Sequence, residues 1–109
     1  MESTAAMSTQ DRFLDCYEAI AVATRRMLDA ARAADWPAFE SGERECRTWI
    51  ERVERLGNPD TLLDAAGRRR RMELLRGVLR DDAALRDILV PWLGQVDRCM
   101  RGRPAARAS

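Results

Sequence analysis

The side chains best suited to chemistry in this chain are arginines and glutamates, because its 109 residues include no histidine. The chain therefore lacks the commonest general base and metal ligand. Glu43 precedes Arg47 by four residues, which is the spacing of an ion pair on a solvated helix face. We predict no catalytic, metal-binding or cofactor-binding residues. A small all-helical enzyme that binds a dicarboxylate with Arg and Glu remains an alternative, because Glu43 lies within an apolar stripe.

The three cysteines, Cys16, Cys46 and Cys99, form no Cys-x-x-Cys pair, and each falls on or beside an apolar helical stripe. This pattern favours free buried thiols over metal ligands or redox centres, and it indicates a reducing cytoplasm. The first residues have neither the basic nor the apolar region of a signal peptide. No apolar run reaches membrane-spanning length, so we expect no membrane insertion.

Helix-forming residues dominate the composition, whereas β-branched and aromatic residues are sparse. The length suits one domain with one core. We predict an all-α fold, a small antiparallel bundle of three to four helices over residues 9–101. The flanking segments are expected to be a flexible N-terminus over residues 1–8 and a disordered tail over residues 102–109, which has no apolar anchor.

Caps and apolar spacing divide the first half of the chain into two helices. Ser8 or Thr9 can cap the first, which is expected to end near Ala34. Asp35 can cap the second, and Gly57 is its stop signal.

The second half contains two further helical segments in this interpretation. The third begins after the turn signal Asn58-Pro59-Asp60 and closes at Asp81-Asp82, which would also cap the fourth. Pro91 lies inside the fourth segment. A mid-helix proline costs about 3 kcal/mol, because it deletes one hydrogen bond and clashes with the preceding turn. We therefore expect the C-terminal helix to be kinked or broken near Pro91.

The apolar stripes of the second and third helices are wider than one neighbour requires. At the helical advance per residue they span about 160°, against about 120° for the first helix. The surplus predicts an apolar partner-binding groove between helices two and three, although ordinary core packing is the alternative. The residues expected to line it are Trp49, Ile50, Val53, Leu56, Met72, Leu75, Val78 and Leu79.

A C-terminal segment also carries an apolar face that must pack somewhere. Its residues are Pro91, Trp92, Leu93, Val96 and Met100. The nearest surplus apolar surface is the groove, so we expect this segment to compete with the partner and thereby regulate binding. Permanent burial of the same residues in the core is the alternative.

Charge is distributed unevenly along a chain whose net charge is only +1. Residues 1–64 contain 8 arginines and 13 acidic residues, whereas residues 65–109 contain 11 arginines and 5 acidic residues. The two halves should attract each other or meet a partner of mixed charge, and the chain as a whole should not bind a polyanion. The run Arg68 to Arg71 points around about 300° of a helix, so it forms no single phosphate-facing patch.

The ordered combination of these segments resembles the flagellar protein FliT family over roughly Thr9 to Met100. The residues that carry the resemblance are Tyr17-Glu18-Ala19-Ile20, Glu45-Cys46, Arg70-Arg71-Met72-Glu73-Leu74-Leu75-Arg76, Val78-Leu79, Asp82-Ala83-Ala84-Leu85-Arg86, Leu89 and Pro91-Trp92-Leu93.

The resemblance implies a cytoplasmic type III flagellar export chaperone that binds the filament-cap protein FliD before secretion and engages the export ATPase apparatus. It also implies a helical protein without a cofactor, with cargo on helices two and three and a regulatory C-terminal helix. Some members bind the flagellar master regulator FlhDC, so a helical regulatory adaptor that binds a transcriptional regulator is the alternative function. The oligomeric state is open, with a homodimer among the alternatives.

The charge pattern predicts that this chain does not bind nucleic acid directly and specifically. Binding to duplex DNA should be weak, independent of sequence and removed by salt, because the arginines are spread around the helix. Electrophoretic mobility shift at increasing salt measures this. A sequence-selective complex of the chain alone at physiological salt would contradict it.

Overall fold

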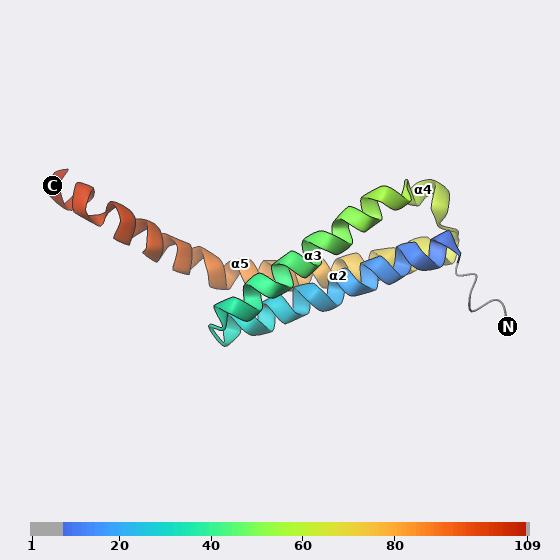
Figure 1. Cartoon of the computed structure of the whole chain (residues 1–109), viewed down its shortest axis with the longest axis horizontal. Helices are drawn as coiled ribbons and strands as arrows, with labels where there is room; N and C mark the ends of the chain where they lie inside the picture. The colour runs from blue at the N-terminus through green and yellow to red at the C-terminus, as the bar shows by residue number, and fades with distance from the viewer. Residues whose placement is uncertain (1–7, 109) are drawn as a thin grey trace.

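The computed structural model describes residues 8–108 and, within the last helix, the side chains as far as Pro91 and that of Arg98. Four helices form this part of the chain (Figure 1). They are α2 (Thr9–Arg32), α3 (Trp36–Leu56), α4 (Pro59–Leu62) and α5 (Ala65–Ala108). The described residues contain no strand, and the predicted all-α bundle is confirmed. Residues 1–7 of the expected flexible N-terminus lie outside the described residues.

The ends of α2 and α3 follow the local signals in the sequence. The Ser8 hydroxyl accepts a hydrogen bond from the Asp11 N–H at 3.0 Å, which satisfies one of the free donors of the first turn. The Asp35 carboxylate does the same for the Ala38 N–H at 3.2 Å. Gly57 ends α3 with a φ of 120°, a left-handed value that favours glycine. These predicted caps and stops are confirmed.

Hydrogen bonds of Asp64 connect the start of α5 to α2. The Gly67 N–H donates to Asp64 Oδ1 at 2.8 Å, and the Asp64 N–H donates to Gln10 Oε1 at 2.7 Å. The Gly67 N–H and the Gln10 amide, which donates to Asp64 Oδ2, hold the pKa of the Asp64 carboxyl below its ordinary value. A single third helix from Asn58-Pro59-Asp60 was therefore the wrong prediction. The short α4 comes first, and the Asp64 cap begins a separate α5.

α5 is one helix where the sequence predicted two, so the predicted break at Asp81-Asp82 is wrong. Asp81 forms a salt bridge with Arg25 of α2 at 3.1 Å. Asp82 pairs with Arg86 one turn further on, at 3.0 Å. Both carboxylates thus have partners without capping a new helix, and the alanines and leucine that follow favour continuation of α5.

Pro91 does not break α5 either. The helix continues to Ala108, past Gly102, where the sequence predicted a disordered tail. Figure 1 shows α5 changing direction where it leaves α2 and α3, as a proline kink would. Proline removes only one backbone hydrogen bond, and the alanines and arginines near the end of the chain favour helix. The domain boundary at residue 101 stays a prediction.

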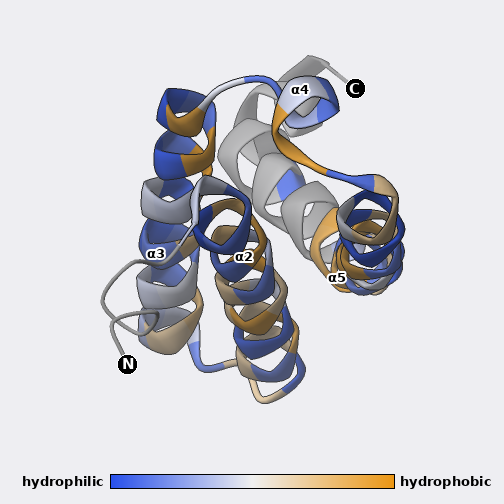
Figure 2. Ribbon diagram, turned by 90° about the vertical axis from the view of Figure 1, so that its right-hand side faces the viewer, coloured by the Kyte–Doolittle hydropathy of each residue, from blue (hydrophilic) through white to orange (hydrophobic). Residues whose placement is uncertain are grey.

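α2 is the central helix, with α3 packed on one side and α5 on the other (Figure 2). α3 returns antiparallel to α2 after the turn at residues 33–35 (Figure 1). The residue pairs that link α2 and α5 follow the same order along both helices, so α5 runs in the same direction as α2. These links are Gln10 with Asp64, Glu18 with Arg70, and Arg25 with Asp81.

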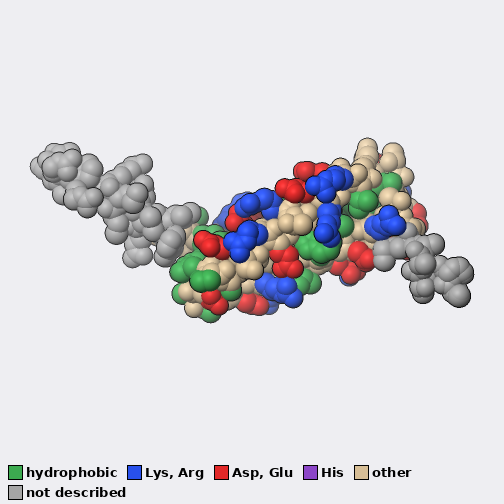
Figure 3. Space-filling view, in the orientation of Figure 1, with side chains coloured by type: hydrophobic (Ala, Val, Ile, Leu, Met, Phe, Trp, Pro, Cys, Tyr) green, Lys and Arg blue, Asp and Glu red, His purple; other side chains and the backbone are tan. Residues whose placement is uncertain are grey.

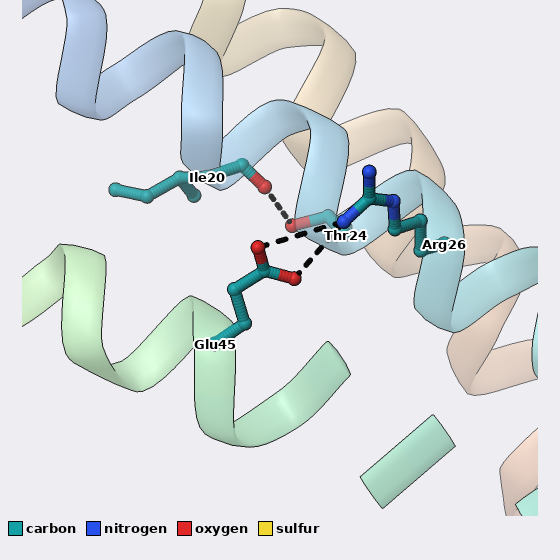
Figure 4. A network of polar contacts seen from close by, with 4 residues as sticks. All are labelled: Ile20, Thr24, Arg26 and Glu45. Atoms are coloured by element: carbon teal, nitrogen blue, oxygen red, sulfur yellow. Dashed lines mark hydrogen bonds and ion pairs between the residues drawn. The ribbon is translucent and has the colours of Figure 1, made fainter. Parts of the chain in front are cut away.

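The interior is formed chiefly by α2. Its buried residues are Phe13, Cys16, Ile20, Ala23, Thr24, Leu28, Ala30 and Ala31. Leu28 and Ala31 pack with Leu85 of α5, and Trp36 and Phe39 of α3 lie against this cluster. The Thr24 hydroxyl is satisfied by donating to the Ile20 carbonyl at 2.8 Å (Figure 4).

The close approach of α3 to α2 depends on Gly42, the one buried residue of α3. A Cβ at this position would lie 2.7 Å from Cγ of Met27, which is closer than packed carbon atoms come. An ion pair between Arg26 and Glu45, at 3.3 Å, joins the same two helices at the surface (Figure 4). The absence of a Cβ at Gly42 therefore allows the backbones of α2 and α3 to pack closely.

Substitution of Gly42 with leucine should lower the free energy of unfolding by about 1–3 kcal/mol, because the added side chain overpacks the α2–α3 contact. Gly77→Leu is the matched control. A Cβ at Gly77 meets only the mobile end of Arg80, at 3.7 Å, so the control should gain up to about 1 kcal/mol of helix propensity. Urea denaturation followed by circular dichroism measures both. Equal stabilisation by the two substitutions would contradict the assigned role of Gly42.

Candidate functional site

α3 buries its apolar stripe only in part. Ile50 is 43% exposed. Trp49, Val53 and Leu56 are only half-buried. Figure 1 shows α3 close to α2 near their connecting turn and spreading away from it toward α4. Because the two helices diverge, the C-terminal half of the stripe has no neighbour to complete its burial.

An apolar groove lies where α3 and α5 face each other across α2. We call it the central groove; it has a volume of about 340 Å³. Its lining residues are Tyr17 and Ile20 of α2, Ile50, Val53 and Glu54 of α3, and Leu74, Leu75 and Val78 of α5. Such a groove can accept the apolar face of another helix, because its walls are themselves helices with side chains at helical spacing.

Two polar features lie at the edge of the central groove. The Arg71 Nε donates a hydrogen bond to the Tyr17 hydroxyl at 3.0 Å, and the guanidinium lies 5.3 Å from the centre of the Tyr17 ring. These contacts hold the ring in place between α2 and α5. Glu54 is exposed and forms no salt bridge with a described residue. It is the one charged residue among those that line the groove.

The structure brings together half of the eight residues expected to bind a partner. Ile50, Val53, Leu75 and Val78 line the central groove. The sequence did not assign Tyr17, Ile20 and Leu74 to it, although all three lie on apolar stripes. The groove was expected between the second and third helices alone, because nothing local indicates that α3 and α5 would leave α2 open between them.

The other four residues lie elsewhere. Met72 and Leu79, which are 45% and 63% exposed, are not among the residues of the central groove. Trp49 and Leu56 line a separate hollow of about 420 Å³ between α2 and α3. We call it the lateral hollow; its further lining residues are Arg12, Asp15, Cys16, Arg52 and Arg55.

The predicted regulatory segment follows the direction of α5. Pro91 is exposed, whereas the side chains of Trp92, Leu93, Val96 and Met100 lie outside the described residues. The backbone of α5 carries this segment away from α2 and α3 (Figure 1). In this arrangement the segment does not lie over the central groove, because α5 stays helical through Pro91 instead of folding back.

Three arginines of the run Arg68 to Arg71 have separate partners, which agrees with the prediction that the run forms no single patch. Arg68 donates to the Leu63 carbonyl at 2.8 Å, and Arg70 pairs with Glu18 at 3.3 Å. Arg71 donates a hydrogen bond to the Tyr17 hydroxyl. On the face shown in Figure 3, basic and acidic side chains of the described residues lie interspersed. This arrangement differs from the continuous positive surface of a phosphate-binding protein.

Neither of the two thiols that the structure describes lies in surroundings that would activate it as a nucleophile. Cys16 is buried and Cys46 is half-buried, and both are free. Burial raises the pKa of both thiols above the ordinary value, which keeps them protonated and weakly nucleophilic. The side chain of Cys99 lies outside the described residues. Within residues 8–108 no helix is both long and apolar enough to span a membrane.

The chain is similar to known flagellar proteins. The family described as flagellar protein FliT matches residues 14–104. The crystal structure of flagellar protein FliT from Bordetella bronchiseptica has 36% sequence identity to the chain and a TM-score of 0.68. That match covers 80% of this chain and 97% of the Bordetella chain. Comparison with curated proteins finds no match.

Proposed function

Because this chain belongs to the FliT family of flagellar proteins, which are chaperones and not enzymes, we propose that it binds the filament-cap protein FliD in the cytoplasm before export. The observation that carries the proposal is the central groove, where apolar side chains from three helices line an open surface. An export chaperone needs such a surface, because its cargo has apolar segments that must be covered before assembly.

An amphipathic helix of FliD is the occupant that fits this groove best. Ile50 and Val53 lie three residues apart on α3, and Leu75 and Val78 lie three apart on α5, so each wall presents one face of a helix. Each Leu- or Val-sized side chain that the cargo buries there contributes about 1.5–3 kcal/mol before ordering costs. Glu54 at the rim would favour a cargo helix with Lys or Arg at its edge.

The proposal includes contacts with the export ATPase apparatus, for which membership of the family is the support. The central groove supports only the cargo part, because a groove of this kind matches an apolar helix and carries no feature specific for an ATPase. The two activities can therefore be tested separately, with FliD and with the ATPase as purified partners.

Substitution of Val78 with aspartate should weaken FliD binding on the order of a hundredfold or more, because an unpaired carboxylate would be desolvated against the apolar cargo. Leu79→Asp is the matched control, since it introduces the same charge one residue away at a side chain that is 63% exposed. Isothermal titration calorimetry with purified FliD measures both.

Circular dichroism shows whether these variants remain folded. Ile50→Asp provides a second groove variant on α3, at a side chain already 43% exposed, should Val78→Asp lose helix content. If folded groove variants bound FliD as tightly as Leu79→Asp and the parent chain, the central groove would not be the cargo site.

Removal of the segment after Val90 should tighten FliD binding. We propose that a bend at Pro91 lets the segment reach the central groove in a second arrangement, and that cargo binds only the open one. The apparent affinity of the full chain is then reduced by the fraction that is open. Comparing the FliD affinity and thermal stability of the 1–90 fragment with those of the full chain tests this. Weaker or equal binding by a folded fragment would exclude competition by the segment, and an unfolded fragment would make the segment structural.

A further inference from the structure

We propose that the lateral hollow is a second docking site, specific for an acidic peptide segment of a protein partner. It is separate from the central groove, because no residue is shared between the two linings and none of the lateral lining comes from α5. The proposal does not depend on FliD being the cargo.

The lateral hollow combines an apolar wall with a basic rim. Trp49 and Leu56 lie seven residues apart on α3 and therefore share one face, and the buried Cys16 of α2 lies between the two helices. Arg52 lies between Trp49 and Leu56 along α3, and Arg12 lines the same hollow from α2. A ligand must therefore present an apolar side chain and negative charge together.

The arginines at this site are available for a ligand. Neither Arg12 nor Arg52 forms a salt bridge with a described residue. Arg55 has only a loose, exposed contact with Glu51 of the preceding turn, at 3.9 Å. Asp15 is the one acidic residue in the lining, so the three arginines leave an excess of two positive charges. Elsewhere on α2 and α3, Arg26 is neutralised by a carboxylate from the other helix.

Arg52 is also held in a position to bind carboxylates. Its guanidinium lies 4.5 Å from the centre of the Trp49 ring, a cation–π contact that restricts the side chain before any ligand arrives. A planar guanidinium on an aromatic face keeps its N–H groups free to donate to a carboxylate in a bidentate manner. Less conformational entropy is lost on binding than for a freely moving arginine.

The ligand chemistry follows from these features. Small inorganic anions would engage the arginines but leave Trp49 and Leu56 uncovered, and a purely apolar helix would bury Arg12 and Arg52 without partners. An acidic amphipathic peptide satisfies both halves of the surface at once. Because the two sites are separate, the chain could hold cargo in the central groove and a second, acidic partner in the lateral hollow.

The test uses a fluorescein-labelled synthetic helical peptide of leucine and glutamate, and the same peptide with glutamine at every glutamate. Fluorescence anisotropy with the full chain should show binding of the glutamate peptide that weakens with salt, and much weaker binding of the glutamine peptide. Arg52→Glu and Arg12→Glu should each reduce the affinity at least about tenfold, as expected for the loss of a charge-assisted contact.

Arg80→Glu is the charge-matched control, because Arg80 is exposed on α5 and lines neither site. Val78→Asp should leave binding of the acidic peptide unchanged or slightly reduced, which separates this site from the central groove. In a ¹⁵N-labelled sample the indole N–H signal of Trp49, assigned with Trp49→Phe, should shift on addition of the peptide, whereas that of Trp36 should not.

Equal binding of the glutamate and glutamine peptides would overturn the proposal. The same holds if Arg52→Glu and Arg12→Glu bind as tightly as Arg80→Glu, or if the Trp49 signal does not move at saturation. Because the two arginines lie on different helices, one folded variant is sufficient for the comparison should the other lose helix content.

Discussion

The packing of α2 against two helices at once is the constraint on which the rest of the structure depends. One helix supplies most of the buried side chains, and it has to serve α3 on one side and α5 on the other. Gly42 allows α3 to approach, and Leu85 anchors α5 to the cluster around Leu28. A helix shared in this way holds its two neighbours in place without requiring them to cover each other.

Because α3 and α5 do not cover each other, part of their apolar surface is not buried against another helix. α3 diverges from α2, and although Gly42 is buried and Trp36 and Phe39 pack on the core, the C-terminal half of its stripe is half-buried or exposed. The radius of gyration of 18.9 Å exceeds the value of about 13 Å expected for a compact chain of this length, because α5 extends beyond the other helices. Most of the buried side chains therefore come from α2, and apolar side chains on α3 and α5 remain partly exposed.

The ion pairs between α2 and α5 match the parallel arrangement of these two helices and add little to its stability. Glu18–Arg70 is about half exposed on both sides, whereas Arg25–Asp81 joins an exposed arginine to an aspartate that is 15% exposed. Exposed pairs of this kind contribute about 0–1 kcal/mol each. The two pairs occur in the same order along both helices, as the parallel arrangement of α5 on α2 requires. The Gln10–Asp64 hydrogen bonds fix the starting point. Of these links, Glu18–Arg70 is the one that joins an acidic residue of the first half of the chain to an arginine of the second half.

The sequence by itself determined the features that depend on interactions within one or two turns. The caps at Ser8 and Asp35, the stop at Gly57 and the helical character of each stripe are local, because a side chain there meets backbone groups only a few residues away. Only the tertiary structure decided whether Asp81 ended a helix, since its partner Arg25 lies on another element. The tertiary structure also decided that Trp49 and Val78 line different sites. The direction in which α3 diverges from α2 determines which residues of its apolar stripe lie toward α2 and which lie toward α5.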